Sequence, residues 1–108
     1  MLLDCSVAAQ CDPTGNCKPG DNAWNFAIEP TETNDDGTGT YTVRNQGEAR
    51  PASGESRTGP FFWNEAGSFR YSLTLTGETS ALFVQQNLKS GQQDIETKVE
   101  FLTCEVSF

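Results

Sequence analysis

Apolar and polar residues alternate along much of this chain, which is the pattern of half-buried β-strands. Trp24, Phe26 and Ile28 alternate with polar or small residues, and Tyr41 and Val43 repeat the pattern. No segment carries a helical period beyond one or two turns. The pattern therefore predicts an all-β protein.

The later strands follow the same alternation, although their phase is harder to assign. Every odd position of 69–76 is apolar, from Phe69 to Leu75. In the next strand we expect Leu82 and Val84 to point inward and Phe83 to point outward. In the last strand one face is expected to carry Ile95, Thr97, Val99 and Phe101, and the next face Leu102, Cys104, Val106 and Phe108. Because the adjacent residues 101 and 102 are both apolar, we expect a β-bulge there.

Turn signals separate these strands at intervals of about ten residues, the spacing of a sandwich or barrel. They lie at Asp36-Gly37, Gly67, Gly77-Glu78 and Ser90-Gly91. We predict one antiparallel β-barrel or sandwich of seven to eight strands that spans residues 1–108. The segment 46–60 is poor in apolar residues and rich in Gly, Ser and Pro, so we expect a mobile loop around a weak edge strand.

Four cysteines predict a disulfide-stapled fold. If 5–11 is a strand, Cys5 and Cys11 lie about 20 Å apart, too far to bond. The turn-rich segment 11–17 can close a small loop, so we prefer Cys11–Cys17 with Cys5–Cys104. The pairing of Cys5 with Cys17 and of Cys11 with Cys104 also joins the two ends and stays open.

The disulfides and the charge bear on location and partners. Disulfides persist in oxidising compartments, so we expect a secreted or periplasmic protein in its mature form, after removal of a signal peptide. Fifteen acidic and seven basic residues give a net charge of −8. Such a surface repels phosphate backbones and anionic lipids, so we expect neither nucleic-acid nor membrane binding.

Candidate catalytic chemistry is sparse. The chain has no histidine, the commonest general base and metal ligand. No pair of carboxylates stands out among the fifteen acidic residues, so we expect no enzyme activity, no cofactor and no metal site. Residues 32–37 resemble half of a calcium loop, but Val43 falls where the last acidic ligand would be, and a hairpin turn is favoured.

The run Phe61-Phe62-Trp63 is the most suggestive local feature. Neighbours in a strand point to opposite sides, so at least one ring, expected to be Phe62, faces outward. It lies under a covering loop, or it anchors a partner, because aromatic side chains dominate binding hot spots. We name Phe61, Phe62, Trp63 and Phe83 as candidate binding residues, with Phe83 extending the patch.

An acidic single domain of short antiparallel strands with crosslinked ends resembles the small calycin-type barrels, which include lipocalins, avidins and some bacterial protease inhibitors. The lipocalin G-x-W motif is not met, because Gly20 and Trp24 are spaced too far apart. Residues 4–11 and 101–105 look similar to segments of small exported bacterial proteins. The resemblance covers about a fifth of the chain and implies an exported location rather than an activity.

These observations favour a non-enzymatic binding module. The leading hypothesis is a protein-interaction module, acting on a partner or on a second copy through 46–63 and the hairpin near 34–38. The alternatives are a small-ligand carrier that uses a barrel interior and an inhibitor of a secreted hydrolase. The side chains expected to point inward are Trp24, Phe26, Ile28, Tyr41, Val43, Phe69, Tyr71, Leu73, Leu75, Leu82 and Val84, a set large enough to fill a small barrel.

Overall fold

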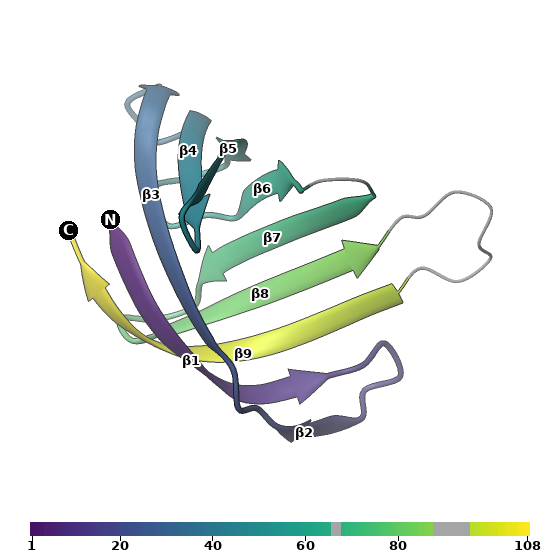
Figure 1. Ribbon diagram of the computed structural model, residues 1–108. Helices are drawn as coiled ribbons and strands as arrows, with labels where there is room; N and C mark the ends of the chain where they lie inside the picture. Colours follow the sequence, from purple (N-terminus) through teal and green to yellow (C-terminus); the bar gives the residue numbers. More distant parts are fainter. Residues whose placement is uncertain (66–67, 88–95) are drawn as a thin grey trace.

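The computed structural model describes residues 1–65, 68–87 and 96–108, which form strands and turns (Figure 1). The strands in chain order are β1 (Leu2–Cys11), β2 (Cys17–Pro19), β3 (Ala23–Thr33), β4 (Gly39–Asn45), β5 (Glu48–Gly54), β6 (Phe61–Asn64), β7 (Phe69–Leu75), β8 (Ser80–Asn87) and β9 (Glu96–Ser107). Within these described ranges no helix is long and apolar enough to cross a membrane.

The sheet closes on itself. All neighbouring strands are antiparallel, and the order β1-β3-β4-β5-β6-β7-β8-β9 is completed by pairing of β1 with β9. In Figure 1 the strands β3 to β5 face β7 to β9 across the interior. The extra strand β2 pairs with the end of β1 outside this ring. The predicted all-β antiparallel fold is confirmed, in the form of a closed eight-stranded barrel.

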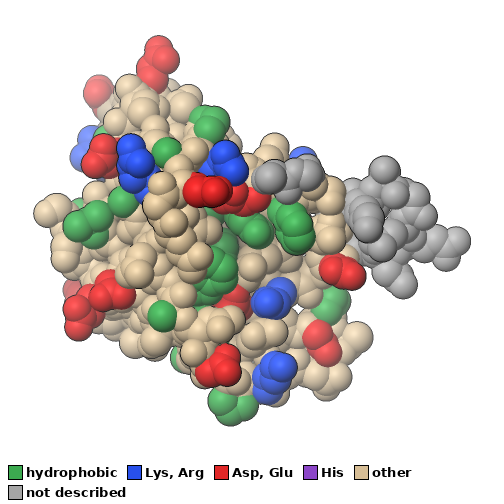
Figure 2. All heavy atoms as spheres, viewed as in Figure 1, with side chains coloured by type: hydrophobic (Ala, Val, Ile, Leu, Met, Phe, Trp, Pro, Cys, Tyr) green, Lys and Arg blue, Asp and Glu red, His purple; other side chains and the backbone are tan. Residues whose placement is uncertain are grey.

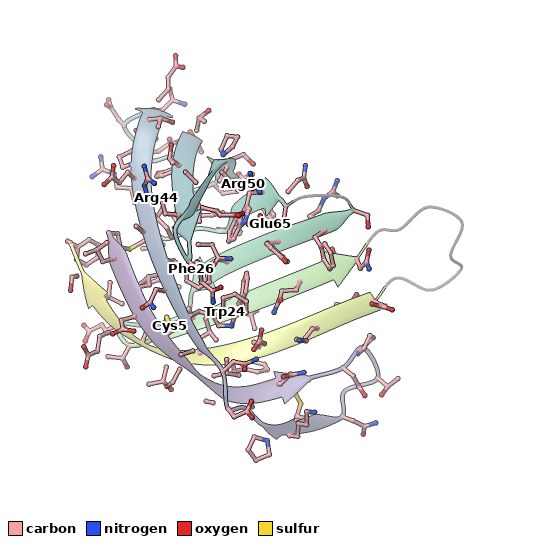
Figure 3. All side chains as sticks on the ribbon, viewed as in Figure 1. Cys5, Trp24, Phe26, Arg44, Arg50 and Glu65 are labelled. Atoms are coloured by element: carbon pink, nitrogen blue, oxygen red, sulfur yellow. A yellow bond between two sulfur atoms is a disulfide. The ribbon has the colours of Figure 1, made fainter. Side chains whose placement is uncertain are left out.

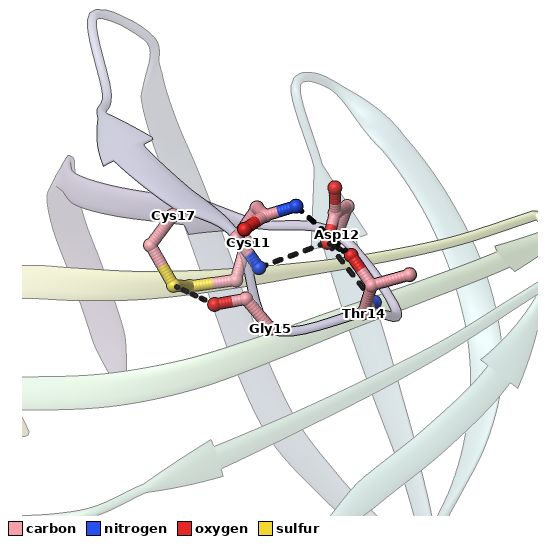
Figure 4. Close-up of a disulfide and its surroundings, with 6 residues drawn as sticks. Cys11, Asp12, Thr14, Gly15 and Cys17 are labelled. Carbon is pink, nitrogen blue, oxygen red and sulfur yellow. Dashed lines mark hydrogen bonds between the residues drawn. A yellow bond between two sulfur atoms is a disulfide. The ribbon is translucent and has the colours of Figure 1, made fainter.

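Two disulfides staple the fold, in the pairing that the sequence favoured. Cys5–Cys104 joins directly opposed residues of β1 and β9, so it locks the seam where the barrel closes. Cys11–Cys17 closes the β1–β2 hairpin (Figure 4). In that hairpin the carboxylate of Asp12 accepts hydrogen bonds from the backbone N–H of Thr14 and of Asn16, each at 3.0 Å. The hydrogen bond from the Thr14 hydroxyl, together with these backbone bonds, lowers the pKa of Asp12.

The interior is filled mainly by aromatic and aliphatic side chains. The rings of Phe26, Trp63 and Phe83 form its centre, with edge-to-face contact between Phe26 and Phe83 at 5.1 Å. The other buried side chains of this core are Leu3, Cys5, Val7, Ile28, Tyr41, Val43, Ala52, Phe61, Leu73, Ala81, Leu102 and Cys104. The alternation predicted around Phe26 and Ile28, and around Tyr41 and Val43, is confirmed.

The predicted phase of β8 is wrong. Ala81 and Phe83 point into the core, whereas Leu82 and Val84 lie on the outer side and are only partly buried. Both faces of this strand carry apolar side chains, so its alternation alone does not say which face is the inner one. Pairing with β7 decides the phase, because Phe83 stands opposite the buried Leu73.

The predicted bulge in the last strand is also misplaced. The described part of β9 alternates without interruption, with Leu102 and Cys104 buried and Phe101 exposed. The register shift occurs in β1, where Val7 opposes Leu102 and Ala9 opposes Phe101. Ala8 is therefore the extra residue, and it turns the end of β1 toward β2.

The segment 46–60 contains a paired strand within the sheet. Glu48–Gly54 forms β5, which pairs along its whole length with β4. It is not an edge strand, although it pairs with β6 only at Ser53 and Gly54. The prediction of an edge strand is wrong, because β5 lies between β4 and β6 in the sheet, with the small or short side chains of Ala49, Pro51 and Ser53 facing outward. The mobility of the segment stays a prediction.

The turns follow the glycine signals where they can be checked. Gly37 has a φ of 90° in the β3–β4 hairpin, a conformation that glycine accepts at low cost. The β7–β8 turn contains Gly77 and Glu78. Gly67, Ser90-Gly91 and Ile95 lie outside the described residues.

Candidate functional site

The two ends of the barrel differ in composition. At one end, here called the closed end, β3 finishes and β6 begins. The opposite end, here called the mouth, is where β3 begins, β4 finishes and β7 begins. A cavity of about 450 Å³ lies at the mouth. Its lining residues are Trp24, Asn45, Gln46, Glu48, Arg50, Glu65, Phe69 and Tyr71.

Aromatic side chains from two facing sides of the barrel, β3 and β7, line the mouth cavity. Trp24 and Tyr71 both contact the ring of Phe83 beneath them, with centroid separations of 5.0 and 5.4 Å. Phe69 lies 6.2 Å from Tyr71 and is 41% exposed at the rim. Figure 3 shows Trp24 and Phe26 directed into the barrel interior. In Figure 2, hydrophobic side chains gather in the hollowed centre of this view, with acidic and basic side chains around them.

An ion pair spans the side of the mouth where β5 and β6 separate. Arg50 of β5 donates to Glu65, just after β6, with its Nε 2.9 Å from the carboxylate (Figure 3). The other oxygen of Glu65 accepts from the Trp63 indole at 3.1 Å, and Arg50 also contacts Glu48 at 3.1 Å. Glu65 raises the pKa of Arg50, so the guanidinium stays charged. The pair thus replaces the backbone bonds that β5 and β6 do not make here.

The same ion pair affects Tyr71. Burial raises the pKa of the Tyr71 hydroxyl, and the negative charge of Glu65 raises it further. Tyr71 is therefore a neutral hydroxyl across the neutral pH range, available as a hydrogen-bond donor or acceptor.

Three buried polar atoms in the described part of the chain lack partners, and two of them belong to residues that line the mouth cavity. Among the described residues, the buried side-chain atoms without a hydrogen bond are Trp24 Nε1, Asn45 Oδ1 and Glu100 Oε2. Trp24 and Asn45 line the mouth cavity, and Glu100 lies next to Phe83 across β8 and β9. A buried polar group without a partner costs roughly 1–3 kcal/mol, so such groups are uncommon where they serve only the fold.

Other hollows lack this combination. A hollow of about 620 Å³ near the closed end is formed around the exposed terminal residue Phe108, together with Leu75 and Val106. Another, of about 490 Å³, lies over the outside of β1 and β3 and includes the exposed Leu2. No buried unpartnered polar atom of the described residues lies among the linings of these two. Aromatic walls with a few converging polar groups in a barrel mouth are typical of small-molecule sites.

The structure separates the aromatic residues that we proposed for binding. Phe62 faces outward and is 39% exposed, as expected. Phe61 and Trp63 are buried, and Phe83, expected on the outside, is wholly buried in the core. The four residues therefore form no common surface patch. On the outer face, Phe62 stands in a row across β6 to β9 with Ser72, Val84 and Val99, each opposite the next. The outer neighbours of Phe62 therefore come from other strands.

Sequence reasoning missed Arg50, Glu65 and Glu100. Arg50 lay in the supposed loop, and nothing in sequence spacing connects it with Glu65. Glu100 could have been found from its place between Val99 and Phe101, because a strand with apolar neighbours on its outer face can direct a charged residue inward. For metal binding, no group of three or more His, Cys, Asp or Glu in the described parts of the chain is arranged to hold an ion.

No family model matches the chain, and neither does any curated protein or solved structure. The resemblance to calycin-type barrels therefore stays a prediction. The two disulfides fit an oxidising compartment.

Proposed function

We propose that this protein is a non-enzymatic binding module that takes a small ligand into the mouth of its barrel, and that it acts in a secreted or periplasmic setting. The observation that carries the proposal is the convergence of Trp24 and Asn45, each with an unpartnered buried polar atom, on one aromatic-walled cavity. Its volume of about 450 Å³ suits a small molecule of roughly one to three rings.

The closed end supports this assignment because it leaves the mouth as the entrance. Phe61 and Leu73 are wholly buried there, and Tyr41 packs on Phe61 at 4.9 Å. A ligand that enters at the mouth therefore meets a packed floor and sits shallowly, with the rim of β3, β4 and β7 around it.

Binding of a neutral fluorescent probe, N-phenyl-1-naphthylamine, tests the proposal. We expect saturable binding to the wild type, and at least fivefold weaker binding to Trp24→Ala and Tyr71→Ala. The matched control is Phe62→Ala, which removes an aromatic ring from the outer surface. Binding that is not saturable, or that is lost in Phe62→Ala and kept in both mouth variants, would contradict the proposal.

A second candidate function, a protein-interaction module, is favoured by the outer face of β6 to β9. Its exposed or half-exposed apolar side chains include Phe62, Leu82, Val84, Val99 and Phe101. Outward positions from Thr97 to Thr103 on β9 carry no acidic residue, in a chain of net charge −8. Sedimentation of the wild type and of a Phe62→Ser/Phe101→Ser variant tests it, since self-association through this face would be lost in the variant.

A further inference from the structure

Glu100 is a charged residue type placed inside an aromatic core. It is wholly buried and follows the inward alternation of Leu102 and Cys104 on β9. Its cross-strand neighbour on β8 is Phe83, and the side-chain amide of Gln85 donates to Oε1. Oε2 has no partner. A carboxylate in such a place requires a donor or a cation to offset its desolvation.

The position of Glu100 relates it to the mouth. Phe83, beside Glu100, is the ring on which Trp24 and Tyr71 of the mouth cavity pack. Gln85, which bonds Glu100, stands directly opposite Tyr71 across β7 and β8. Glu100 thus lies one residue step below the aromatic wall of the cavity, behind the half-buried side chain of Gln85.

The charges at the mouth favour a positive ligand. The guanidinium of Arg50 is already engaged by Glu65 and Glu48, two carboxylates for one cation. Aromatic faces attract organic cations through the negative face of the ring. An aromatic cavity with a buried carboxylate behind its wall, beside Phe83 and bonded by Gln85, has the chemistry that recognises an ammonium group attached to an apolar body.

We infer that the mouth selects small organic amines, whose ammonium group pairs with Glu100 Oε2 while an aromatic or alkyl body lies against Trp24 and Tyr71. This inference rests on the proposed function and specifies its ligand class. The amine reaches Glu100 past Gln85, whose amide rotates aside or stays as the second donor. A hydroxyl or carbonyl oxygen on the ligand would accept the unpartnered Trp24 indole N–H.

Three ligands of similar shape test the charge preference on the wild-type protein: phenethylamine, phenethyl alcohol and 3-phenylpropionate. Each competes with N-phenyl-1-naphthylamine at neutral pH, where they are cationic, neutral and anionic. We expect the amine to bind at least tenfold more tightly than the alcohol, and the acid to bind most weakly. Equal affinities for amine and alcohol would overturn the amine assignment and leave the mouth site standing. Failure of all three ligands and of the probe would count against the mouth site itself.

A pair of matched variants assigns the preference to Glu100. Glu100→Gln keeps the shape and an acceptor for Gln85, and Glu105→Gln removes the same charge from the exposed face of the same strand. We expect the amine-to-alcohol ratio to fall to within twofold in Glu100→Gln and to remain at least tenfold in Glu105→Gln. A ratio that is unchanged in folded Glu100→Gln, as judged by circular dichroism, overturns the role of Glu100. The wild-type comparison remains decisive on ligand class if that variant fails to fold.

Discussion

The closed end and the mouth of the barrel are built from the same strands, yet they treat polar groups in opposite ways. At the closed end the Tyr41 hydroxyl donates to the Gly37 carbonyl, and its ring lies against Gly54, where a Cβ would come within 2.5 Å of the ring. At the mouth, Trp24 and Asn45 keep buried polar atoms that have no partner, and so does Glu100 behind the cavity wall. One end is completed by its own chain, whereas the other keeps buried groups that the proposed ligand would complete.

Under the proposed function, this difference separates the end that stabilises the fold from the end that binds the ligand. A satisfied, densely packed interior stabilises the fold, and unsatisfied buried groups destabilise it unless a ligand completes them. Binding sites commonly cost stability for this reason. We therefore expect substitutions at the two ends to have effects of different size and, in one case, of opposite sign.

The largest expected effect comes from the disulfides. Cys5–Cys104 closes a loop with a sequence separation of 99, and Cys11–Cys17 one of 6. In the chain-entropy account their removal costs about 4–5 and about 2 kcal/mol of unfolding free energy. Urea unfolding of the two Cys→Ala double variants measures both. No loss on removal of Cys11–Cys17 would show that the β1–β2 hairpin lies outside the cooperative unit that the seam disulfide stabilises.

Truncation of an aromatic ring distinguishes the two ends more directly. Phe61→Ala at the closed end removes a wholly buried ring, so we expect a loss of about 3–5 kcal/mol. Phe69→Ala at the rim of the mouth should cost less than about 1 kcal/mol, since the ring is already 41% exposed. Thermal and urea denaturation of both variants provide the measurement. A large loss in Phe69→Ala would mean that the rim is part of the packed core.

Polar substitutions should differ in sign. Tyr41→Phe removes a satisfied hydrogen bond and leaves the Gly37 carbonyl without its donor, so we expect a loss of about 1–2 kcal/mol. Glu100→Gln removes a buried charge and keeps the shape, so we expect a gain of about 1 kcal/mol in the ligand-free protein. The comparison uses urea unfolding without added ligand. A destabilised Glu100→Gln variant would indicate that the carboxylate serves the fold.

The smallest expected effect is a shift in a titration. Glu65→Gln removes the charge that helps to raise the pKa of Tyr71, so this pKa should fall toward its ordinary value and stay above it because burial remains. A folded pKa above the unfolded value of about 10 gives stability that is fully present below that pH and is lost as the pH rises through the folded pKa. As the pH rises into the alkaline range, the ionisation of Tyr71 should therefore lower the unfolding free energy less in Glu65→Gln than in the wild type.

Tyrosinate absorbance measures this shift, in a Tyr41→Phe background so that Tyr71 is the remaining tyrosine. The matched control is Glu55→Gln, which removes an exposed charge at the closed end of β5. If the pKa of Tyr71 is the same in both variants, the charge of Glu65 does not act on Tyr71.

The parts of the fold that were predictable are those in which one face of a strand is clearly apolar. Phe26 and Ile28 have polar or small neighbours, so their inward direction could be read from the alternation. Phe83 has apolar neighbours on both sides in the chain, Leu82 and Val84, and it was assigned to the wrong face. Such strands are placed by pairing with their neighbours, which local periodicity does not contain.

The candidate site was less predictable than the fold. Trp24 and Tyr71 were expected to point inward, but as filling of the core rather than as a cavity wall. Arg50 and Glu65 are separated by a turn and a short strand, and they meet because β5 and β6 diverge. A site formed by the end of the barrel depends on which strand ends coincide, and this follows from the register of every pair around the ring.

The sequence by itself determined that the chain forms an antiparallel β structure with its two ends joined by a disulfide, because alternation and cysteine placement can be read along the chain. Tertiary structure decided that Cys5 is the partner of Cys104, which face of β8 and β9 is inside, that the irregularity falls at Ala8, and that Glu100 is buried beside Phe83. The physical reason is that every strand of the closed barrel pairs with two neighbouring strands, so its register must fit both. This double pairing decides which face of a strand points inward when both faces carry apolar residues.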